Sequence, residues 1–274
     1  MPYPLLLEIL TFVSQRRGID FRDYRRDMLR RRAQSRVRAT GCTDLAAYRS
    51  YLMTDREEVD RLIETLVVPV TEFFRDAWTF RELDRCVLPI LAARNAPIRA
   101  WVVGAATGEE AYTLAILLAE ASARGTGGGF EMIASDLDRR SLEVARAGVY
   151  PAAAAVGIPH ELFPRYFRSN GSGIRIADSL RDRIQFAQHD LVGPYLAPQE
   201  AIVAAFDIVL CRNVLLYFDA TLRAKAVARL AAVLEPGAVL MIGHSETLPA
   251  ESERHFHPHP GAKTNAGILV RRAS

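Results

Sequence analysis

Apolar positions in the first 94 residues recur at the three- and four-residue spacing of helices that bury one face. The first such stripe consists of Leu5, Ile9, Phe12 and Val13. The pattern predicts a helix that ends at Gly18, a second over residues 21–39, and a third, short helix capped by Thr43. The chain is therefore expected to begin with helices alone.

Two further helices are expected downstream. Thr54 and Glu57 form a capping box, TDRE, that opens a helix running to about Val68. Residues 77–94 carry one more apolar stripe and predict a linker helix. We therefore expect residues 1–76 to form an all-helical N-terminal domain.

From residue 95 onward, short apolar runs alternate with amphipathic helices. The expected strands are residues 98–103, 130–135, 206–211, 238–243 and 267–271, and the expected helices are residues 109–123, 142–147 and 220–234. Such alternation is typical of βαβ units in a mostly parallel sheet. We therefore predict a Rossmann-like α/β domain over residues 95–274, with helices on both faces of its sheet. Short apolar runs at 174–176 and 184–187, near the turn NGSG, predict a small antiparallel β insertion over about residues 165–190.

The composition of the 274 residues, half of them hydrophobic and 24% charged, is typical of a soluble globular protein. No apolar run is long enough to predict a membrane span, and the N-terminal apolar and basic residues stand in the reverse order to a signal peptide. The three cysteines form no CxxC pair, so neither a disulfide framework nor a zinc site is expected. The histidines of residues 255–267 are separated by prolines and predict a polar turn rather than a metal site. These features predict a cytoplasmic protein.

The net charge is only +3, but residues 16–38 hold ten arginines against three aspartates, which gives +7 there. A basic helix of this kind indicates an acidic partner: a nucleic acid, a membrane surface or an acidic protein. The alternative is a solvated helix in which arginine serves only helix formation.

The turn after the first predicted strand, Gly104-Ala-Ala-Thr-Gly108-Glu109-Glu110, departs from the GxGxxG of dinucleotide sites. A dinucleotide places its pyrophosphate on the first amides of the helix, where Glu109 and Glu110 would repel it. S-adenosylmethionine carries no phosphate, and a glutamate can pair with its ammonium group. The helix dipole alone would account for Glu109, but the two glutamates together favour S-adenosylmethionine.

Polar residues also follow two other predicted strands, at the edge where α/β sheets bind ligands. Asp136 ends the second strand and is the expected ribose ligand, whereas Asp138 suits a helix cap. Arg212 and Asn213 follow the strand 206–211, where substrate would meet cofactor. A turn followed by a core tyrosine, Tyr217, is the alternative there.

A series of segments, in order and with the right gaps, resembles the CheR-type chemotaxis receptor methyltransferases. The segments are QRRGIDFRDYRRDML (15–29), VTEFFRD (70–76), ATGEEAYTLA (106–115), ASDLD (134–138), ARAGVY (145–150), RYF (165–167), FDIVLCRNVLLYFD (206–219) and LEPGAVLMIGHSE (234–246). These enzymes transfer a methyl group from S-adenosylmethionine to glutamate side chains of chemoreceptors, leaving S-adenosylhomocysteine. The resemblance implies a class I methyltransferase fold over the α/β domain.

The resemblance also implies roles for residues. The implied cofactor-binding residues are Thr71, Arg75, Gly104, Glu110, Asp136, Asp190, Leu191, Arg212 and Asn213. Glu110 would hold the methionine ammonium and Asp136 the ribose. Asp190 and Leu191 would flank the adenine.

Two residues are expected to be catalytic. A substrate glutamate, with a pKa of about 4.3, is already ionised at neutral pH, so no general base is needed. Arg75 would orient that carboxylate, and Tyr217 would lie beside the reacting methyl group. Thr71 and Arg75 would reach the cofactor from the helical domain. The family often has asparagine where this chain has Pro69, so one polar cofactor contact is either lost or made by the backbone.

The implied partner is the acidic cytoplasmic helical bundle of a chemoreceptor. Its expected contacts are the arginines Arg30, Arg31, Arg32 and Arg36 of the basic helix. The small β insertion resembles the subdomain that docks a receptor tail in some family members, although this copy is short. We expect a monomer with no nucleic-acid partner and no membrane insertion.

Two alternatives remain at this point. A nucleic-acid methyltransferase would use the arginines on phosphates, but such enzymes usually carry an (N/D)PPY-like motif where this chain has RNVLLY. A non-catalytic relative that senses S-adenosylmethionine or a nucleotide would tolerate Pro69 and the unusual tail.

Overall fold

The computed structural model describes residues 3–67, 71–125, 128–201 and 205–273. Its contacts divide the chain into two compact units, residues 1–69 with 216–223, and residues 70–215 with 224–274. The second unit therefore includes residues 71–76, which the sequence had assigned to the helical domain, and also the predicted linker helix. Among the described residues, no helix combines the length and the hydropathy that a membrane crossing requires.

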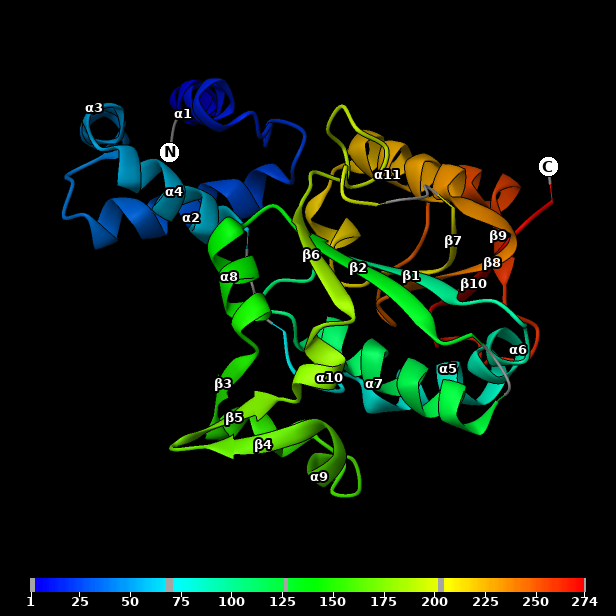
Figure 1. Ribbon diagram of the computed structural model, residues 1–274. Helices are drawn as coiled ribbons and strands as arrows, with labels where there is room; N and C mark the ends of the chain where they lie inside the picture. The colour runs from blue at the N-terminus through cyan, green and yellow to red at the C-terminus, as the bar shows by residue number, and fades with distance from the viewer. Residues whose placement is uncertain (1–2, 68–70, 126–127, 202–204, 274) are drawn as a thin grey trace. The chain divides into compact units, whose positions relative to one another are not determined.

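The smaller unit is helical, as predicted. Its helices are α1 (Tyr3–Arg17), α2 (Arg26–Ala39), α3 (Leu45–Thr54) and α4 (Arg56–Leu66) (Figure 1). The apolar stripe of α1 is buried at Leu6, Ile9, Leu10 and Val13. These side chains form the core of the unit together with Leu29 of α2, Tyr48 of α3 and Leu62 of α4, which are at most 1% exposed. Burial of one face of each helix thus accounts for the spacing in the sequence.

The helix starts differ from the predictions. Helix α2 begins at Arg26 rather than at residue 21, because the preceding loop makes other hydrogen bonds. The amide of Arg25 donates to the carbonyl of Tyr217 at 2.9 Å, and Tyr24 forms a β-bridge with Phe218. Helices α3 and α4 are capped by Asp44 and Asp55 instead of the threonines before them, since the carboxylates accept the free amides of each first turn.

The larger unit is built on a seven-stranded sheet, which confirms the predicted α/β fold. Its strands are β1 (Ile98–Val103), β2 (Phe130–Asp136), β6 (Ile184–Gln188), β7 (Phe206–Cys211), β8 (Leu234–Ile242), β9 (Phe256–Pro258) and β10 (Ile268–Arg271). They lie in the order β6-β2-β1-β7-β8-β10-β9. The first five are parallel, and β10 runs antiparallel to both of its neighbours.

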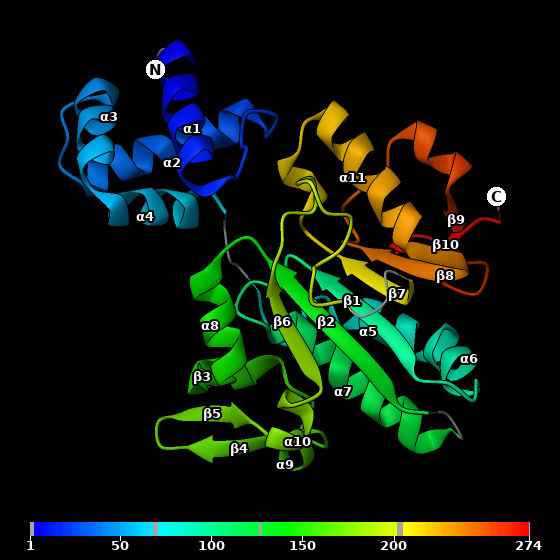
Figure 2. The same ribbon diagram turned by 45° about the horizontal axis from the view of Figure 1, so that its top comes forward.

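Helices cover both faces of this sheet. Figure 2 shows α5 (Ala77–Cys86) and α7 (Glu109–Arg124) on one face and α11 (Ala220–Val233) on the other. The remaining helical segments are α6 (Leu88–Ala92), α8 (Arg139–Ala147), α9 (Phe163–Tyr166), α10 (Asp178–Arg181), η1 (Ala152–Gly157), η2 (Leu215–Tyr217) and η3 (Ala250–Arg254). The single helix predicted over residues 77–94 is broken at Val87, because Pro89 opens α6 and has no amide to continue the ladder of α5.

The small antiparallel sheet lies earlier in the chain than predicted. It contains β3 (Val149–Pro151), β4 (Phe167–Asn170) and β5 (Gly173–Ile176) in the order β3-β5-β4. The run at 184–187, predicted to belong to this insertion, is strand β6 of the main sheet and pairs in parallel with β2. Burial explains this, because Ile184 and Phe186 enter the main core. The predicted polar turn at 255–267 likewise contains β9, which pairs with β10.

Candidate active site

The turn between β1 and α7 has an unusual backbone that brings it close to its neighbours. Gly104, Ala106 and Gly108 have positive φ angles of 70°, 47° and 96°. A Cβ atom on Gly104 would lie 2.4 Å from Cγ2 of Val214, and one on Gly108 would lie 2.8 Å from Cβ of Ala145. A larger residue at position 104 or 108 would therefore clash with these neighbours, and its backbone would be strained at a positive φ angle.

Asp136, at the end of β2, fixes this turn. Its Oδ2 accepts the amide of Ala106 at 2.8 Å, and its Oδ1 accepts the amide of Asp138 at 2.9 Å. Burial raises the pKa of the Asp136 carboxyl, and these amide hydrogen bonds oppose the rise. Asp138 is the N-cap of α8, accepting the amides of Arg140 and Ser141. Asp136 is thus placed at the predicted ligand edge beside the turn.

A buried arginine joins two acidic side chains from different elements. The side chain of Arg212, which follows β7, is fully buried. Its Nη1 donates to Oε2 of Glu110 at 2.7 Å, and its Nη2 donates to Oδ2 of Asp76 at 2.9 Å. The guanidinium also lies 4.8 Å from the ring centroid of Phe80. His244 extends the network, with its Nδ1 3.2 Å from the same Asp76 oxygen.

The electrostatics of Glu110 follow from this arrangement. Burial raises the pKa of its carboxyl, and the positive charges of Arg212 and Arg75 lower it. The lowering favours the ionised form at neutral pH, because a buried carboxylate stays charged only beside a cation. An ionised carboxylate at the first turn of a helix is suited to a ligand ammonium group.

The segment 71–76 reaches this network through a strained turn. The amide of Phe74 donates to the hydroxyl of Thr113 in α7 at 3.0 Å, and the carbonyl of Arg75 accepts from Arg212 at 3.3 Å. Thr71 and the Arg75 side chain are half-buried. In the described parts of the chain, the non-glycine residues with positive φ are Phe74, Asp76, Ala106 and Asn213. All four lie in this site, and strain of this kind gathers where a ligand is held.

Asn213 and the residues after β8 complete the edge of the site. Oε2 of Glu246 accepts the amides of Asn213 and Gly243, each at 2.8 Å. Among the described residues, Oδ1 of Asn213 and Nε of Arg212 are buried and have no hydrogen-bond partner. Buried polar atoms of native proteins are normally paired, so these two atoms fit a polar ligand that supplies the missing partners.

The turn after β6 lies at the same edge. The amide of His189 donates to the carbonyl of Asp136 at 3.0 Å, which sets the predicted adenine-flanking residues beside the end of β2. Oδ1 of Asp190 accepts the amide of Val192 at 3.0 Å, and the carbonyl of Leu191 accepts Nε of Arg229 at 2.6 Å. Burial raises the pKa of the Asp190 carboxyl.

The other predicted residues belong to the helical unit. The ring of Tyr217 lies 6.0 Å from the guanidinium of Arg32. Arg32 also donates to the carbonyl of Thr65, and Arg36 forms an ion pair with the buried Glu58. The two remaining predicted arginines, Arg30 and Arg31, are exposed. Pro69 lies outside the described residues.

Three residues of the network were missed by the sequence interpretation: Asp76, His244 and Glu246. Asp76 stands next to Arg75 in VTEFFRD, and the other two follow a strand that was correctly predicted. The rule that ligand sites follow the carboxyl ends of strands would have indicated His244 and Glu246. The pairing of Asp76 with Arg212, 136 positions away, has no local signal.

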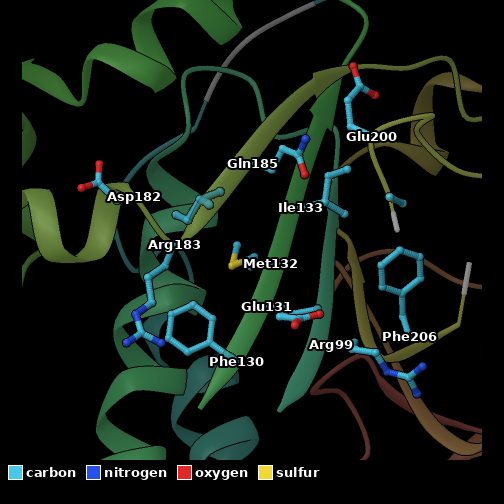
Figure 3. Close-up of a pocket in the computed structure, with 13 residues that line it drawn as sticks. Arg99, Phe130, Glu131, Met132, Ile133, Asp182, Arg183, Gln185, Glu200 and Phe206 are labelled. Atoms are coloured by element: carbon cyan, nitrogen blue, oxygen red, sulfur yellow. The ribbon is translucent and has the colours of Figure 1, made fainter. Parts of the chain in front are cut away.

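A separate groove of about 660 Å³ lies near the starts of the same strands. Figure 3 shows the side chains of Glu131, Ile133 and Gln185 along it, from β2 and β6. The residues that line it include none of the predicted site residues. Because α/β sheets bind ligands at the opposite, carboxyl edge, the groove is not the candidate site. No cluster of metal-ligating side chains is present in the parts of the chain that the structure describes.

Comparisons with known proteins agree with this geometry. Residues 69–264 match the family model "CheR methyltransferase, SAM binding domain", and residues 5–67 match "CheR methyltransferase, all-alpha domain". The chemotaxis protein methyltransferase of Escherichia coli (strain K12) is 34% identical over 260 residues, covering 90% of this chain and 85% of that protein. The protein of the same name from Salmonella typhimurium is 34% identical over 249 residues, covering 87% of this chain and 82% of that protein.

A third relative, an uncharacterized 104.1 kDa protein of Rhodobacter capsulatus, is 33% identical over 251 residues; the match covers 90% of this chain but only 26% of that much longer protein. The two family models together cover most of the chain and meet close to the boundary between its two units. The predicted family, fold and cofactor are therefore confirmed: the chain belongs to the CheR methyltransferase family, and its larger unit is an S-adenosylmethionine-binding methyltransferase domain.

Proposed function

We propose that this protein transfers a methyl group from S-adenosylmethionine to glutamate side chains of chemoreceptors, forming glutamate methyl esters. The names of the relatives support the receptor substrate. The observation that carries the proposal is the network of Glu110, Arg212 and Asp76 beside the unpartnered Oδ1 of Asn213. When bound, the cofactor supplies the electrophilic methyl group.

The residues at the carboxyl edge divide the binding of the cofactor among them. Glu110, whose ionised form Arg212 favours against the effect of burial, would pair with the methionine ammonium. Asp136 would hold the ribose hydroxyls, and the turn at Asp190 and Leu191 would enclose the adenine. Gly104 would line the cofactor with its backbone, and its lack of a side chain lets the turn pass against Val214.

Methyl transfer to a carboxylate requires orientation rather than proton removal. The substrate glutamate is ionised at neutral pH, since its pKa is about 4.3. The protein therefore has to align the carboxylate and exclude water, and such positioning contributes roughly 7–11 kcal/mol in favourable cases. Arg75 would orient the substrate carboxylate with its planar guanidinium. Tyr217 would shape the space around the methyl group.

The basic helix α2 would contact the receptor. Arg30 and Arg31 are exposed, whereas the guanidinium groups of Arg32 and Arg36 make hydrogen bonds inside the unit. We therefore assign the main electrostatic contact with an acidic helical bundle to the exposed pair. Association should weaken as salt rises, because exposed charges are screened.

The test is transfer of tritiated methyl groups from S-adenosylmethionine to membranes that contain chemoreceptors. Base-labile, volatile label in the receptor is expected, as methyl esters hydrolyse in base. Label in added RNA would indicate a nucleic-acid methyltransferase, and cofactor binding without transfer would indicate a sensing protein. Either result would contradict the proposal.

The role of Arg75 is tested by Arg75→Ala, with Arg81→Ala as the control. Arg81 is an exposed arginine of α5, six positions further along the chain. Turnover at saturating cofactor should fall at least tenfold in the first variant and stay within twofold in the second. Normal turnover with weakened cofactor binding in Arg75→Ala would show that Arg75 binds cofactor without orienting the substrate.

A further inference from the structure

The small antiparallel sheet is tied to the cofactor turn by one side chain. Tyr150 lies in β3 and pairs with Ile174 of β5. Its hydroxyl donates to the carbonyl of Thr107 in the turn at 2.8 Å, and the residue is only 3% exposed. We propose that Tyr150 is a positioning residue for the cofactor turn 104–108, acting from the small sheet. The inference rests on the proposed cofactor-binding role of that turn.

The turn needs such support because its backbone is strained. Ala106 and Gly108, on either side of Thr107, both have positive φ angles. The amides of residues 105 and 106 are held by β2, through the Ser135 carbonyl and the Asp136 carboxylate. The Thr107 carbonyl accepts the hydroxyl of Tyr150 instead of a group of β2. Strained conformations persist only where several contacts determine them together, and this hydrogen bond adds a contact from the small sheet to those from β2.

Close packing leaves the Tyr150 hydroxyl little freedom. A Cβ atom on Gly108 would lie 3.2 Å from that oxygen and 2.8 Å from Cβ of Ala145. Burial also raises the pKa of the Tyr150 hydroxyl, so it remains a neutral donor at physiological pH. The turn is thus enclosed between α8 and the first strand of the small sheet.

The same ring supports the other part of the site. The ring of Phe73 meets those of Tyr150 and Phe167 edge to face, at centroid distances of 5.0 and 5.3 Å. A Cβ atom on Gly157 would lie 2.4 Å from the Phe73 carbonyl oxygen, so the segment passes directly against the insertion. Phe73 immediately precedes the segment 74–76, which contains the strained residues Phe74 and Asp76 and reaches Arg212. Tyr150 therefore holds the cofactor turn by a hydrogen bond and the segment 71–76 by packing.

The experiment compares Tyr150→Phe with Tyr112→Phe in the full chain. Tyr112 is a matched control, because it is also buried and its hydroxyl also donates to a backbone carbonyl, that of Ala145, at 2.7 Å. Each variant loses one buried hydrogen bond of a hydroxyl, but only the hydroxyl of Tyr150 bonds to the cofactor turn, and the amide of Tyr112, which donates to the Gly108 carbonyl, is kept in both variants. The probe is S-adenosylhomocysteine, with its dissociation constant measured by calorimetry.

We expect Tyr150→Phe to weaken binding of S-adenosylhomocysteine about threefold to tenfold, the range that corresponds to one hydrogen bond. Tyr112→Phe should change it less than twofold, while both variants lower the unfolding midpoint similarly. The KM for S-adenosylmethionine should rise in Tyr150→Phe with kcat little changed. Hydrogen exchange should become faster at the amides of residues 105–109 in Tyr150→Phe, with exchange in β7 and β8 unaltered.

Equal weakening in the two variants would overturn the inference, because it would reduce Tyr150 to a general stabilising residue. Unchanged binding and unchanged exchange in Tyr150→Phe would also overturn it. Both outcomes would leave the proposed function intact, since the unmodified protein would still bind the probe. Failure of the unmodified protein to bind S-adenosylhomocysteine would instead contradict the proposed function.

Discussion

Each unit of the protein buries a glutamate against an arginine, and the two pairs differ in how completely their hydrogen bonds are satisfied. In the helical unit, Arg36 donates to both oxygens of Glu58, at 2.8 and 2.6 Å, and Tyr48 donates to one of them at 2.8 Å. In the α/β unit, Arg212 bridges Glu110 and Asp76, and its Nε is left without a partner among the described residues. We call the first pair closed, because both oxygens of Glu58 have donors within the unit. We call the second pair open, because the Nε of Arg212 has no partner among the described residues.

The surroundings of the two pairs explain the difference. The helical pair joins α2 and α4 in regular backbone, with no positive φ angle among Arg36, Glu58 and Tyr48. The second pair adjoins the strained residues Asp76 and Asn213, at the carboxyl edge of a parallel sheet. A closed pair fixes the position of the elements that it joins. Under the proposed function, the open pair, with buried polar atoms still unsatisfied, serves the cofactor.

The largest effect should come from removing the cation of the open pair. Arg212→Met leaves the buried Glu110 without its hydrogen-bonded cation, which costs about 3–5 kcal/mol when a buried pair is broken, and it also removes a partner of the half-buried Asp76. We expect binding of S-adenosylhomocysteine to weaken by at least a hundredfold, as measured by calorimetry.

The control for that variant is Arg94→Met. Arg94 forms an ion pair with Asp207 at 3.0 Å, but its side chain is 48% exposed. Exposed pairs contribute little, so binding and unfolding should barely change. If Arg212→Met bound the cofactor product within threefold of the unmodified protein, the open pair would have no part in the site.

The closed pair should respond in stability alone. Arg36→Met removes both guanidinium hydrogen bonds of the fully buried Glu58 and should lower the free energy of unfolding of the helical unit by up to about 3–5 kcal/mol, although Arg61 remains 4.0 Å from that carboxylate. Adding Glu58→Leu should recover part of that loss, because an apolar pair can replace a buried ion pair. The double variant Arg212→Met with Glu110→Leu should likewise recover stability but not cofactor binding. Recovery of binding there would remove the distinction between the two pairs.

A change of pH should alter the affinity for the cofactor product to a moderate extent. Burial raises the pKa of Glu110 in the folded protein above its ordinary value of 4.5. The protonated form is therefore favoured by folding, so this group's contribution to stability is present at acid pH and declines as pH rises. The fraction of Glu110 in the ionised form, which the cofactor ammonium requires, increases over the same rise in pH. Binding of S-adenosylhomocysteine should thus strengthen from pH 5 toward neutrality.

Glu110→Gln should bind more weakly at neutral pH and lose much of this pH dependence. The remainder belongs to Asp136 and Asp190, because burial raises the pKa of both of these carboxyls too. A pH profile identical to that of the unmodified protein would exclude Glu110 as the ammonium partner.

The smallest effect should come from the exposed arginines of α2. Arg30→Gln with Arg31→Gln should raise the KM for receptor membranes about threefold to tenfold at low salt, through loss of exposed charge. Stability and cofactor affinity should stay unchanged. A KM that is unaffected, or an effect that persists in high salt, would place the receptor contact elsewhere.

Much of the fold could be predicted because its signal is local. The apolar runs 98–103 and 206–211 are strands β1 and β7 with the same bounds, since a strand buried on both faces is a continuous apolar run. The start of α2 could not be predicted, because Tyr24 and Arg25 bond to residues 217–218. Which of the two sheets contains residues 184–188 could not be predicted either, because it depends on pairing with β2, a segment far away in the sequence.

The candidate site divides in the same way. Glu110, Asp136, Arg212 and Asn213 could be found because each directly follows a predicted strand or its turn. Asp76 and Tyr150 could not be found as site residues, because their partners, Arg212 and Thr107, are 136 and 43 positions away. Their side chains acquire a role only when the chain is folded.

The sequence by itself therefore determined most of the elements of the main sheet and its ligand-binding edge, because periodicity and strand ends are properties of neighbouring residues. The series of motifs in it indicated the family and the cofactor by resemblance. Only the tertiary structure decided which arginine of the two pairs has a buried nitrogen without a partner in the described parts of the chain. That distinction depends on buried distances between segments far apart in the chain. It separates Arg36 from Arg212, although each stands in the sequence simply as an arginine near polar neighbours.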